Sequence, residues 1–190
     1  KVMSFGLVRL LCGGVKKSKR SGVFMTVSLE SNAFVGRERE LTELSSALES
    51  SLNSRGQLVM LVGEPGIGKT RLAEEITARA TSDGALIGWG ACFEMGSTPP
   101  YWLWTQVIRS LLVDASDSTL RSLRDHASVI AEIVPELAEL SPDITPPPKL
   151  DSTYSRFRLF DAVSSFLHDV SAEQSVVIVL DDLHWADQSS

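Results

Sequence analysis

The stretch Gly63-Glu64-Pro65-Gly66-Ile67-Gly68-Lys69-Thr70 decides the fold of this chain. It follows an apolar run at 58–62 and precedes a helical pattern at 71–80. A strand, a glycine-rich loop and a helix in this order form the context in which backbone N–H groups cradle phosphate oxygens. The glycines permit turns that a Cβ would block, and the helix N-terminus adds unpaired N–H groups and the positive end of its dipole. The sequence therefore predicts a phosphate-binding loop (P-loop) that holds a nucleoside triphosphate.

Two side chains of the P-loop have chemical roles. Lys69 would place its charge on the β and γ phosphates, which also makes it a candidate catalytic residue, and the Thr70 hydroxyl would ligate Mg²⁺. The alternative is an ordinary glycine-rich turn, which the strand–loop–helix context disfavours. The candidate nucleotide-binding residues of this segment are Gly63, Glu64, Pro65, Gly66, Ile67, Gly68, Lys69, Thr70 and Arg71.

A pair of carboxylates forms the second half of the predicted site. Asp181 and Asp182 follow an apolar run at 176–180 that is typical of a parallel strand buried on both faces. Ligands bind at the carboxyl ends of such strands. We expect Asp181 to hold Mg²⁺ with Thr70, and Asp182 to act as a catalytic residue that polarises an attacking water. The alternative, a solvated strand end, becomes weak beside a P-loop.

The remaining periodicity predicts an α/β fold with a parallel sheet. The long separation between Thr70 and Asp181 implies a helical insertion, placed at 97–150. We expect the last long helix to carry Phe157, Phe160, Val163, Leu167 and Val170 on one face. Strands are expected at 57–62, 85–91 and 176–180, and helices at 41–52, 71–80, 101–113, 117–126, 129–140 and 154–170.

The first 24 residues differ in character from the rest. An apolar segment at 2–15 precedes the basic run 16–20, which reverses the order of a secretory signal. A short membrane-touching segment with a basic flank is one interpretation. We favour another, in which Met25 starts the protein and residues 1–24 are a leader that is not native, disordered or loosely packed. Residues 25–33 would then be a linker.

Composition restricts the class of protein. The chain of 190 residues is 43% hydrophobic and 22% charged, with a net charge of -6, so no basic face for nucleic acid is expected. Cys12 and Cys92 are too few and too distant for a disulfide framework, which suits a cytoplasmic protein. His126, His168 and His184 lack metal-ligand spacing. No apolar run approaches the ~20 residues of a membrane span.

From Phe34 onward the chain resembles the ATPase domains of AAA-like and STAND proteins, and it is most similar to the large ATP-binding regulators of the LuxR type in bacteria. The segments that carry the resemblance are Phe-Val-Gly-Arg-Glu at 34–38, the P-loop at 63–70, Pro-Pro-Tyr-Trp-Leu-Trp at 99–104, and Leu-Asp-Asp-Leu-His-Trp-Ala-Asp at 180–187. The resemblance implies a P-loop NTPase three-layer sandwich at 34–190, with ATP and Mg²⁺ as cofactors.

The resemblance also implies residue roles. It places Val35, Gly36 and Arg37 against the adenine and ribose; the alternative for Arg37 is a surface charge that caps a helix. A second group of residues, His184, Trp185 and Asp187, would either link nucleotide state to a partner domain or form a structural turn. Core packing explains Trp102 and Trp104 better than ligand contact does. No role can be assigned to Glu94 or Arg109.

Two departures from the family pattern shape the functional hypothesis. The later strands, sensor residues and winged-helix lid of the family would follow Ser190, so we expect an N-terminal fragment that is inactive by itself. Asp182 stands where the family more often has Glu, and its shorter reach favours binding and slow hydrolysis. No arginine finger can be identified.

The first hypothesis is an ATP-driven switch in a LuxR-type transcription regulator. DNA would bind through a further domain, and ATP binding would promote self-association. The second is a regulatory ATPase module of a nucleotide cyclase or protein kinase. A ring-forming motor is the weaker third hypothesis.

Overall fold

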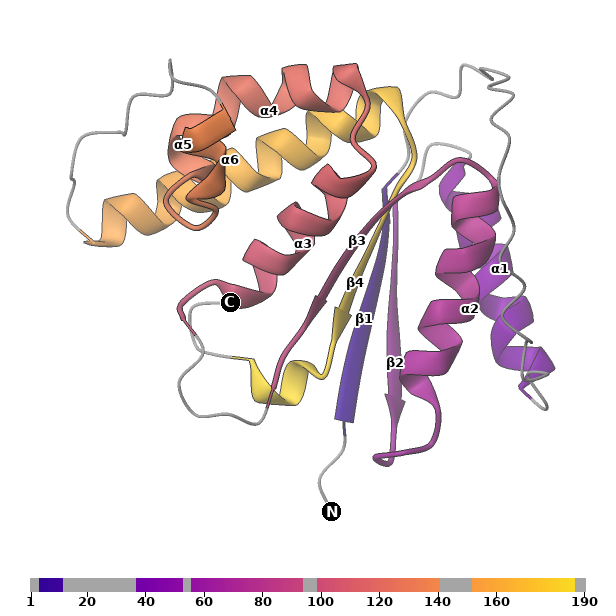
Figure 1. The fold of residues 1–190 in the computed structure, drawn as a ribbon. Helices are drawn as coiled ribbons and strands as arrows, with labels where there is room; N and C mark the ends of the chain where they lie inside the picture. The colour runs from indigo at the N-terminus through magenta and orange to yellow at the C-terminus, as the bar shows by residue number, and fades with distance from the viewer. Residues whose placement is uncertain (1–3, 12–36, 53–55, 94–98, 141–151, 187–190) are drawn as a thin grey trace.

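The computed structural model describes residues 4–11, 37–52, 56–93, 99–140 and 152–186, and Figure 1 shows their arrangement. Some of the residues discussed above lie outside the described residues, namely Val35, Gly36, Glu94, Asp187 and the predicted linker 25–33. The elements in chain order are β1 (Ser4–Leu11), α1 (Glu38–Leu52), β2 (Gln57–Gly63), α2 (Lys69–Ser82), β3 (Leu86–Ala91), α3 (Trp102–Val113), α4 (Asp117–Ile130), α5 (Glu136–Leu140), α6 (Ser152–Glu173), β4 (Val176–Asp181) and the 3-10 turn η1 (Leu183–Trp185).

The four strands form one sheet in the order β2-β1-β4-β3. The strands β3 and β4 are parallel, as expected, and β1 runs antiparallel to both of its neighbours. It follows that β2, β3 and β4 share one direction and that β1 alone is reversed. The predicted parallel sheet is therefore a mixed sheet. Helices α1 and α2 cover one face and α3 with α6 cover the other, so three layers are present (Figure 1).

The position of β1 corrects the expectation for the leader. Its residues pair with β2 from Ser4 opposite Gly63 to Leu10 opposite Gln57, and with β4 from Leu7 opposite Leu180 to Leu11 opposite Val176. Residues 4–11 consequently form a paired strand and are not a disordered segment. The physical reason is that β2 and β4 each present a row of backbone donors and acceptors to the space between them, and an apolar extended segment satisfies both rows. The rest of the predicted leader lies outside the described residues.

Two hydrophobic clusters pack on opposite faces of the sheet and meet at β4. Val177 and Val179 face the cluster that holds α1 and α2, and Ile178 and Leu180 face the cluster that holds α3, α4 and α6. Every residue of β4 is buried, which explains why its sequence is an unbroken apolar run rather than an alternating one. Asp181 is the last residue of this buried strand.

Close packing holds α3 on β3. A Cβ at Gly90 would lie 2.5 Å from the Leu103 carbonyl oxygen, so this approach requires glycine. The backbone N–H of Trp89 donates to Ser110 Oγ at 2.6 Å, and Gln106 Nε2 donates to the Ala91 carbonyl at 2.8 Å. These bonds fix the helix against the end of the strand. The described part of the predicted insertion at 97–150 thus contains helices α3, α4 and α5. The first of them, α3, packs directly on the sheet.

Two helical regions differ from the prediction, one in its boundaries and one in the exposure of its side chains. The expected helices at 117–126 and 129–140 appear as α4, which continues to Ile130, and the short α5. On α6, Phe157 and Phe160 are 68% and 38% exposed, although Leu159 between them is buried at 3%. The N-terminal end of α6 projects beyond the sheet (Figure 1), and Phe160 contacts Tyr101 there in an edge-to-face arrangement. Val163, Leu167 and Val170 are buried.

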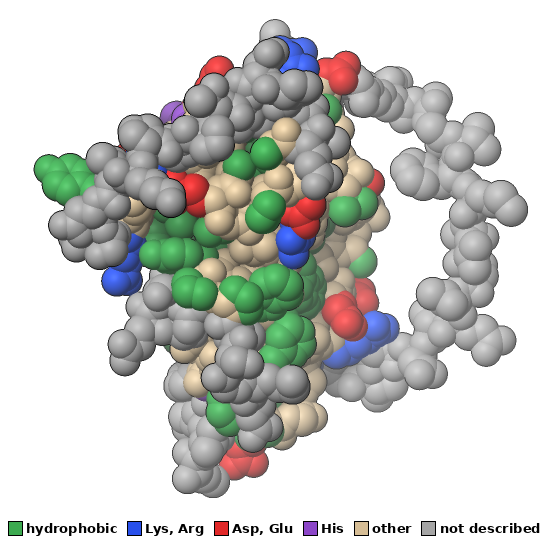
Figure 2. All heavy atoms as spheres, turned by 60° about the vertical axis from the view of Figure 1, so that its left-hand side comes forward, with side chains coloured by type: hydrophobic (Ala, Val, Ile, Leu, Met, Phe, Trp, Pro, Cys, Tyr) green, Lys and Arg blue, Asp and Glu red, His purple; other side chains and the backbone are tan. Residues whose placement is uncertain are grey.

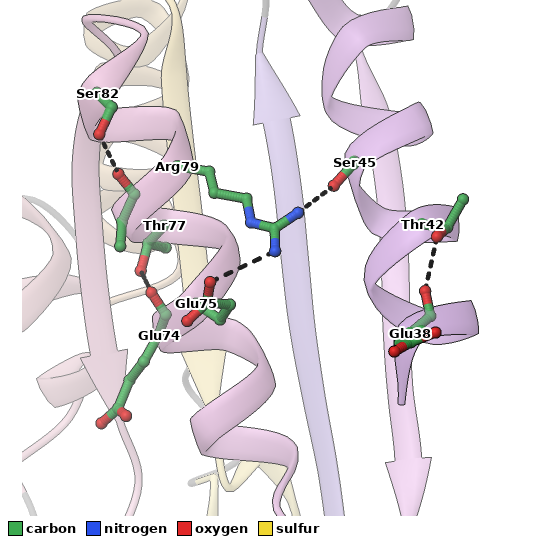
Figure 3. A network of polar contacts seen from close by, with 9 residues as sticks. Glu38, Thr42, Ser45, Glu74, Glu75, Thr77, Arg79 and Ser82 are labelled. Atoms are coloured by element: carbon green, nitrogen blue, oxygen red, sulfur yellow. Dashed lines mark hydrogen bonds and ion pairs between the residues drawn. The ribbon is translucent and has the colours of Figure 1, made fainter. Parts of the chain in front are cut away.

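The helices α1 and α2 are tied together by one arginine (Figure 3). Arg79 of α2 donates to Ser45 Oγ of α1 at 3.2 Å and contacts Glu75 Oε1 at 3.4 Å. Because α2 begins at the P-loop, this contact helps to set its direction. Within the described part of the chain, no helix combines the length and the apolar character needed to cross a membrane.

Candidate nucleotide-binding site

The site lies at the sheet edge where β2 and β4 both end. β2 ends at Gly63, the first residue of the P-loop, and α2 begins at Lys69, its seventh. The other strand ends at Asp181, so the two halves of the predicted site reach the same edge although β1 separates their strands. Parallel direction of β2 and β4 is what makes this meeting possible.

The decisive contact joins the two halves directly. Thr70 Oγ1 donates a hydrogen bond to Asp181 Oδ2 at 2.7 Å. The other carboxylate oxygen, Oδ1, accepts the backbone N–H of Asp182 at 3.0 Å, which fixes the orientation of the group. A hydroxyl and a carboxylate placed together are the hard oxygen donors that Mg²⁺ prefers. The residues present therefore fit the predicted metal, for which Thr70 and Asp181 would be the protein ligands.

Lys69 is a buried cation without a carboxylate partner among the described residues. Its residue surface is 7% exposed, and its Nζ donates to the carbonyl oxygens of Glu64 at 2.9 Å and Gly63 at 3.4 Å. A buried ammonium that contacts only carbonyl dipoles retains most of its desolvation cost. An anion inside the loop would offset that cost. The buried charge of Lys69 thus favours the binding of an anion such as phosphate in the loop.

The backbone of the loop supplies the donors. Gly66 and Gly68 have φ of 76° and 95°, in the left-handed region where a side chain would be strained. The loop closes on itself through the Ile67 N–H, which donates to the Glu64 carbonyl at 3.3 Å. The first N–H groups of α2 have no intrahelical acceptor and carry the positive end of the helix dipole. Both features point to an anion at this position.

Arg37 connects the start of α1 to the P-loop. Its φ of 66° turns the chain sharply, and its Nη2 donates a hydrogen bond to the Ile67 carbonyl. A cavity of about 410 Å³ lies beside this contact and is bordered by Arg37, Lys69 and Leu72 together with residues of α1 and β2. The sequence gives no signal for the contact between Arg37 and Ile67, which are far apart in the chain. Arg37 also caps α1, because its carbonyl accepts the Leu41 N–H at 3.0 Å, so its base-side role stays a prediction beside the helix-cap alternative.

Comparison with protein families agrees with this geometry. A family model described as an AAA ATPase domain matches residues 33–190. The chain belongs to the AAA ATPase domain family. No curated protein matches the chain, and no solved structure does either.

Membership of this family accounts for the P-loop and its partner carboxylate. AAA ATPase domains are P-loop α/β domains that bind and hydrolyse ATP, usually with Mg²⁺. The predictions of a P-loop ATPase domain and of ATP as its nucleotide are therefore confirmed at the level of the family. The two residues that the motif assigns to Mg²⁺, Thr70 and Asp181, are the two that the hydrogen bond joins.

Asp182, the carboxylate that follows Asp181, has an unusual backbone conformation. Asp182 has φ 53° and ψ 38°, a left-handed conformation that costs energy for a residue with a Cβ. It begins the η1 turn, in which His184 is mostly buried and its ring lies 5.0 Å from that of Trp185. His184 Nδ1 is 3.8 Å from Asp182 Oδ1. Asp182 therefore lies at the start of this turn, directly after Asp181, and its role as a water-polarising group stays a prediction.

Three of the predicted residues are placed away from the phosphate position. Arg71 forms an exposed ion pair with Glu74 of the same helix, with Nη1 and Oε2 3.1 Å apart. Trp104 packs against the larger hydrophobic cluster, as expected for core packing. Trp102 stacks under the Arg109 guanidinium, whose Cζ lies 5.6 Å from the ring centroid, and Arg109 also pairs with Glu136. These contacts give Arg109 a structural role that the sequence analysis could not assign.

Proposed function

We propose that this AAA ATPase domain is the Mg²⁺-dependent, ATP-hydrolysing switch of a cytoplasmic bacterial signalling protein, of the kind found in LuxR-type transcription regulators. The observation that carries the proposal is the pairing of Thr70 with Asp181 beside the buried Lys69. Lys69 and Thr70 come from α2 and Asp181 comes from β4, and the chemistry of the three side chains matches a metal–triphosphate complex.

Each residue of the site then has a defined task. The P-loop N–H groups bind the phosphate oxygens, and Lys69 Nζ moves from the carbonyls of Glu64 and Gly63 to the β and γ phosphates. Bound Mg²⁺ would neutralise charge on those phosphates, held by Thr70 and Asp181. Water attacks the γ-phosphorus, the bond to the β-phosphate oxygen breaks, and Asp182 accepts the proton of the water.

The base and ribose are assigned to the cavity beside Arg37. Arg37, with Val35 and Gly36 before it, would contact this part of the nucleotide, while Lys69 at the other border of the same cavity contacts the phosphates. The hydrogen bond from Arg37 to Ile67 supports this assignment, because it joins the predicted base-side segment to the P-loop. Nucleotide binding would then order α1 and the loop together.

The proposed output is DNA binding by a further domain of the same protein, with self-association in the ATP state. The motif at 180–187 favours this class, because it is one of the four segments that resemble LuxR-type regulators. The second candidate is a regulatory module beside a cyclase or kinase domain. Sequencing the reading frame on both sides of the segment distinguishes the two candidates. A helix-turn-helix downstream would support the regulator, and a catalytic domain upstream would support the cyclase or kinase module.

The experiment that tests the site is Lys69→Ala, with Arg121→Ala on the exposed side of α4 as a charge-matched control. Titration with a fluorescent N-methylanthraniloyl ATP and Mg²⁺ should show an affinity lowered about 10- to 150-fold in Lys69→Ala, the worth of a charge-assisted hydrogen bond. The free protein should unfold at the same or a higher temperature, because the variant removes a buried charge. Equal affinity in both variants would refute the site.

A further inference from the structure

A second cavity lies on the other side of the sheet from α1 and α2. It has a volume of about 430 Å³ and opens between α3, the turn after α4, and α6. Figure 2 shows this side of the molecule, where hydrophobic side chains gather on the surface. Pockets that bind small molecules have volumes of about 300–1,000 Å³ and mainly apolar walls. The cavity meets both criteria, and the AAA nucleotide site does not use it.

The walls of the cavity are suited to a flat apolar molecule. Trp104 and Ile133 face it from one side and Val163 and Leu167 from the other. Tyr101 and Phe160 also line it, in an edge-to-face arrangement with centroids 6.1 Å apart. Aromatic walls favour flat ligands because offset stacking and edge contacts add to apolar burial.

One polar group is buried in this lining. Ser171 is 8% exposed, and its hydroxyl donates to the His168 carbonyl at 2.8 Å. Since that bond uses its only hydrogen, the oxygen can offer just its lone pairs to the cavity. Ser164 provides a second hydroxyl in the lining. A ligand with one hydrogen-bond donor on an apolar body would satisfy this acceptor.

Backbone strain occurs at the rim of the same cavity. Tyr101 has φ 62° and ψ 19°, a left-handed conformation that is unfavourable for a bulky residue. Tyr101 therefore precedes the first turn of α3, and its side chain lines the cavity. Strain of this kind persists where the surroundings fix it, and it is concentrated at binding sites and switches.

We propose that this cavity is an effector site that takes a small, planar, apolar molecule with one hydrogen-bond donor, and that the occupied site alters nucleotide affinity. The first part stands independently, and the second part rests on the proposed nucleotide binding.

The coupling follows one mechanical path. Trp104 and Tyr101 lie within a turn of Leu103 and Gln106, the residues that fix α3 to the end of β3. In the sheet, Ala91 at that end pairs with Asp181. The η1 turn is connected too, because Leu183 and Ala186 pack against the same hydrophobic cluster as Tyr101 and Trp104. A ligand that moves the start of α3 therefore acts on the carboxylates at the nucleotide site.

The test uses 5-fluoroindole, a flat bicyclic probe with one N–H donor, observed by fluorine NMR on the full chain. We expect saturable binding with a Kd of about 6 mM or tighter, because about −0.3 kcal/mol per heavy atom gives about −3 kcal/mol for ten heavy atoms. Ser164→Trp places an indole in the lining from an exposed position and should abolish binding. The matched control Ala172→Trp adds the same side chain to an exposed position of α6 outside the cavity. Ser171→Ala should weaken binding at least fivefold.

Three results would overturn the site, and the first two are the absence of saturable binding to the parent chain and equal binding by Ser164→Trp and Ala172→Trp. Sedimentation that shows a dimer dissociated by Ser164→Trp would also overturn it, since a second copy would then cover the face. The coupling predicts that saturating 5-fluoroindole changes affinity for the fluorescent ATP about fivefold or more. An unchanged affinity refutes the coupling, whereas failure of the parent chain to bind the ATP analogue at all refutes the proposed function.

Discussion

Deletion of residues 1–24 removes β1, the strand that lies between β2 and β4. Both neighbours belong to the nucleotide site, since β2 leads into the P-loop at Gly63 and β4 ends at Asp181. A chain that begins at Met25 would leave a strand-wide space between them. The sequence alone suggested a leader outside the native protein, whereas the structure predicts that the sheet depends on residues 4–11.

The register of β1 allows the loss to be estimated. Antiparallel pairs average about one ladder hydrogen bond per residue pair, so the pairing along Ser4–Leu10 with β2 and Leu7–Leu11 with β4 amounts to about a dozen bonds. At about 0.5–1.5 kcal/mol each, these bonds contribute about 6–18 kcal/mol, against a total stability of about 5–15 kcal/mol for a domain. Direct pairing of β2 with β4 would require the two halves of the sheet to approach by about 4.8 Å, together with the helices packed on them.

The assay compares chain 1–190 with chain 25–190 by circular dichroism during thermal unfolding and by titration with fluorescent ATP. We expect no cooperative transition in the shorter chain and no measurable nucleotide binding. Val8→Pro is a milder perturbation at the centre of β1, opposite Val59 and Val179, and should lower stability by about 3 kcal/mol or more because proline removes a ladder donor. A shorter chain that unfolds cooperatively and binds ATP with undiminished affinity would refute the reasoning.

Three further predictions concern single residues. Asp181→Asn should lower the Mg²⁺-dependent part of nucleotide affinity about 10- to 100-fold while affinity in EDTA stays equal or rises, since the variant removes a metal ligand and a negative charge beside the phosphates; paired titrations with Mg²⁺ and with EDTA measure both. Gly90→Ala should lower stability by about 1–3 kcal/mol, visible as a lower midpoint in urea, because its Cβ would meet the Leu103 carbonyl oxygen at 2.5 Å. The hydrogen bond from His126 lowers the pKa of Asp169, so this carboxylate contributes stability above its unfolded pKa of about 3.9 that is lost as the pH falls through the lower folded value; Asp169→Asn should therefore show a flatter loss of stability below pH 4 in urea titrations.

Local patterns predicted the elements of the site well. The apolar run before Gly63 and the periodicity after Thr70 are short-range signals, and β2 and α2 form where they place them. The unbroken apolar run before Asp181 correctly indicated a strand buried on both faces. Each of these inferences depends on neighbours within one or two turns, for which the physics of propensity and burial is local.

Packing overrode the periodicity on α6. The spacing of Phe157 and Phe160 places them on one face with Val163, yet these two are exposed whereas Val163 is buried. The same limitation applies to Arg37, whose partner, the Ile67 carbonyl, lies in a different element. A helical period states which residues share a face and not how far the opposing surface reaches.

What the sequence by itself determined is the chemistry: a P-loop with its Lys and Thr, a carboxylate at the end of a buried strand, and through them an ATPase of the AAA class. Only the tertiary structure decided that residues 4–11 complete the sheet between the two halves of that site, and that α3 and α6 enclose a second cavity. The physical reason is that motif chemistry depends on adjacent residues, whereas strand order and cavities depend on which distant backbone groups and side chains remain unpaired when all elements have packed.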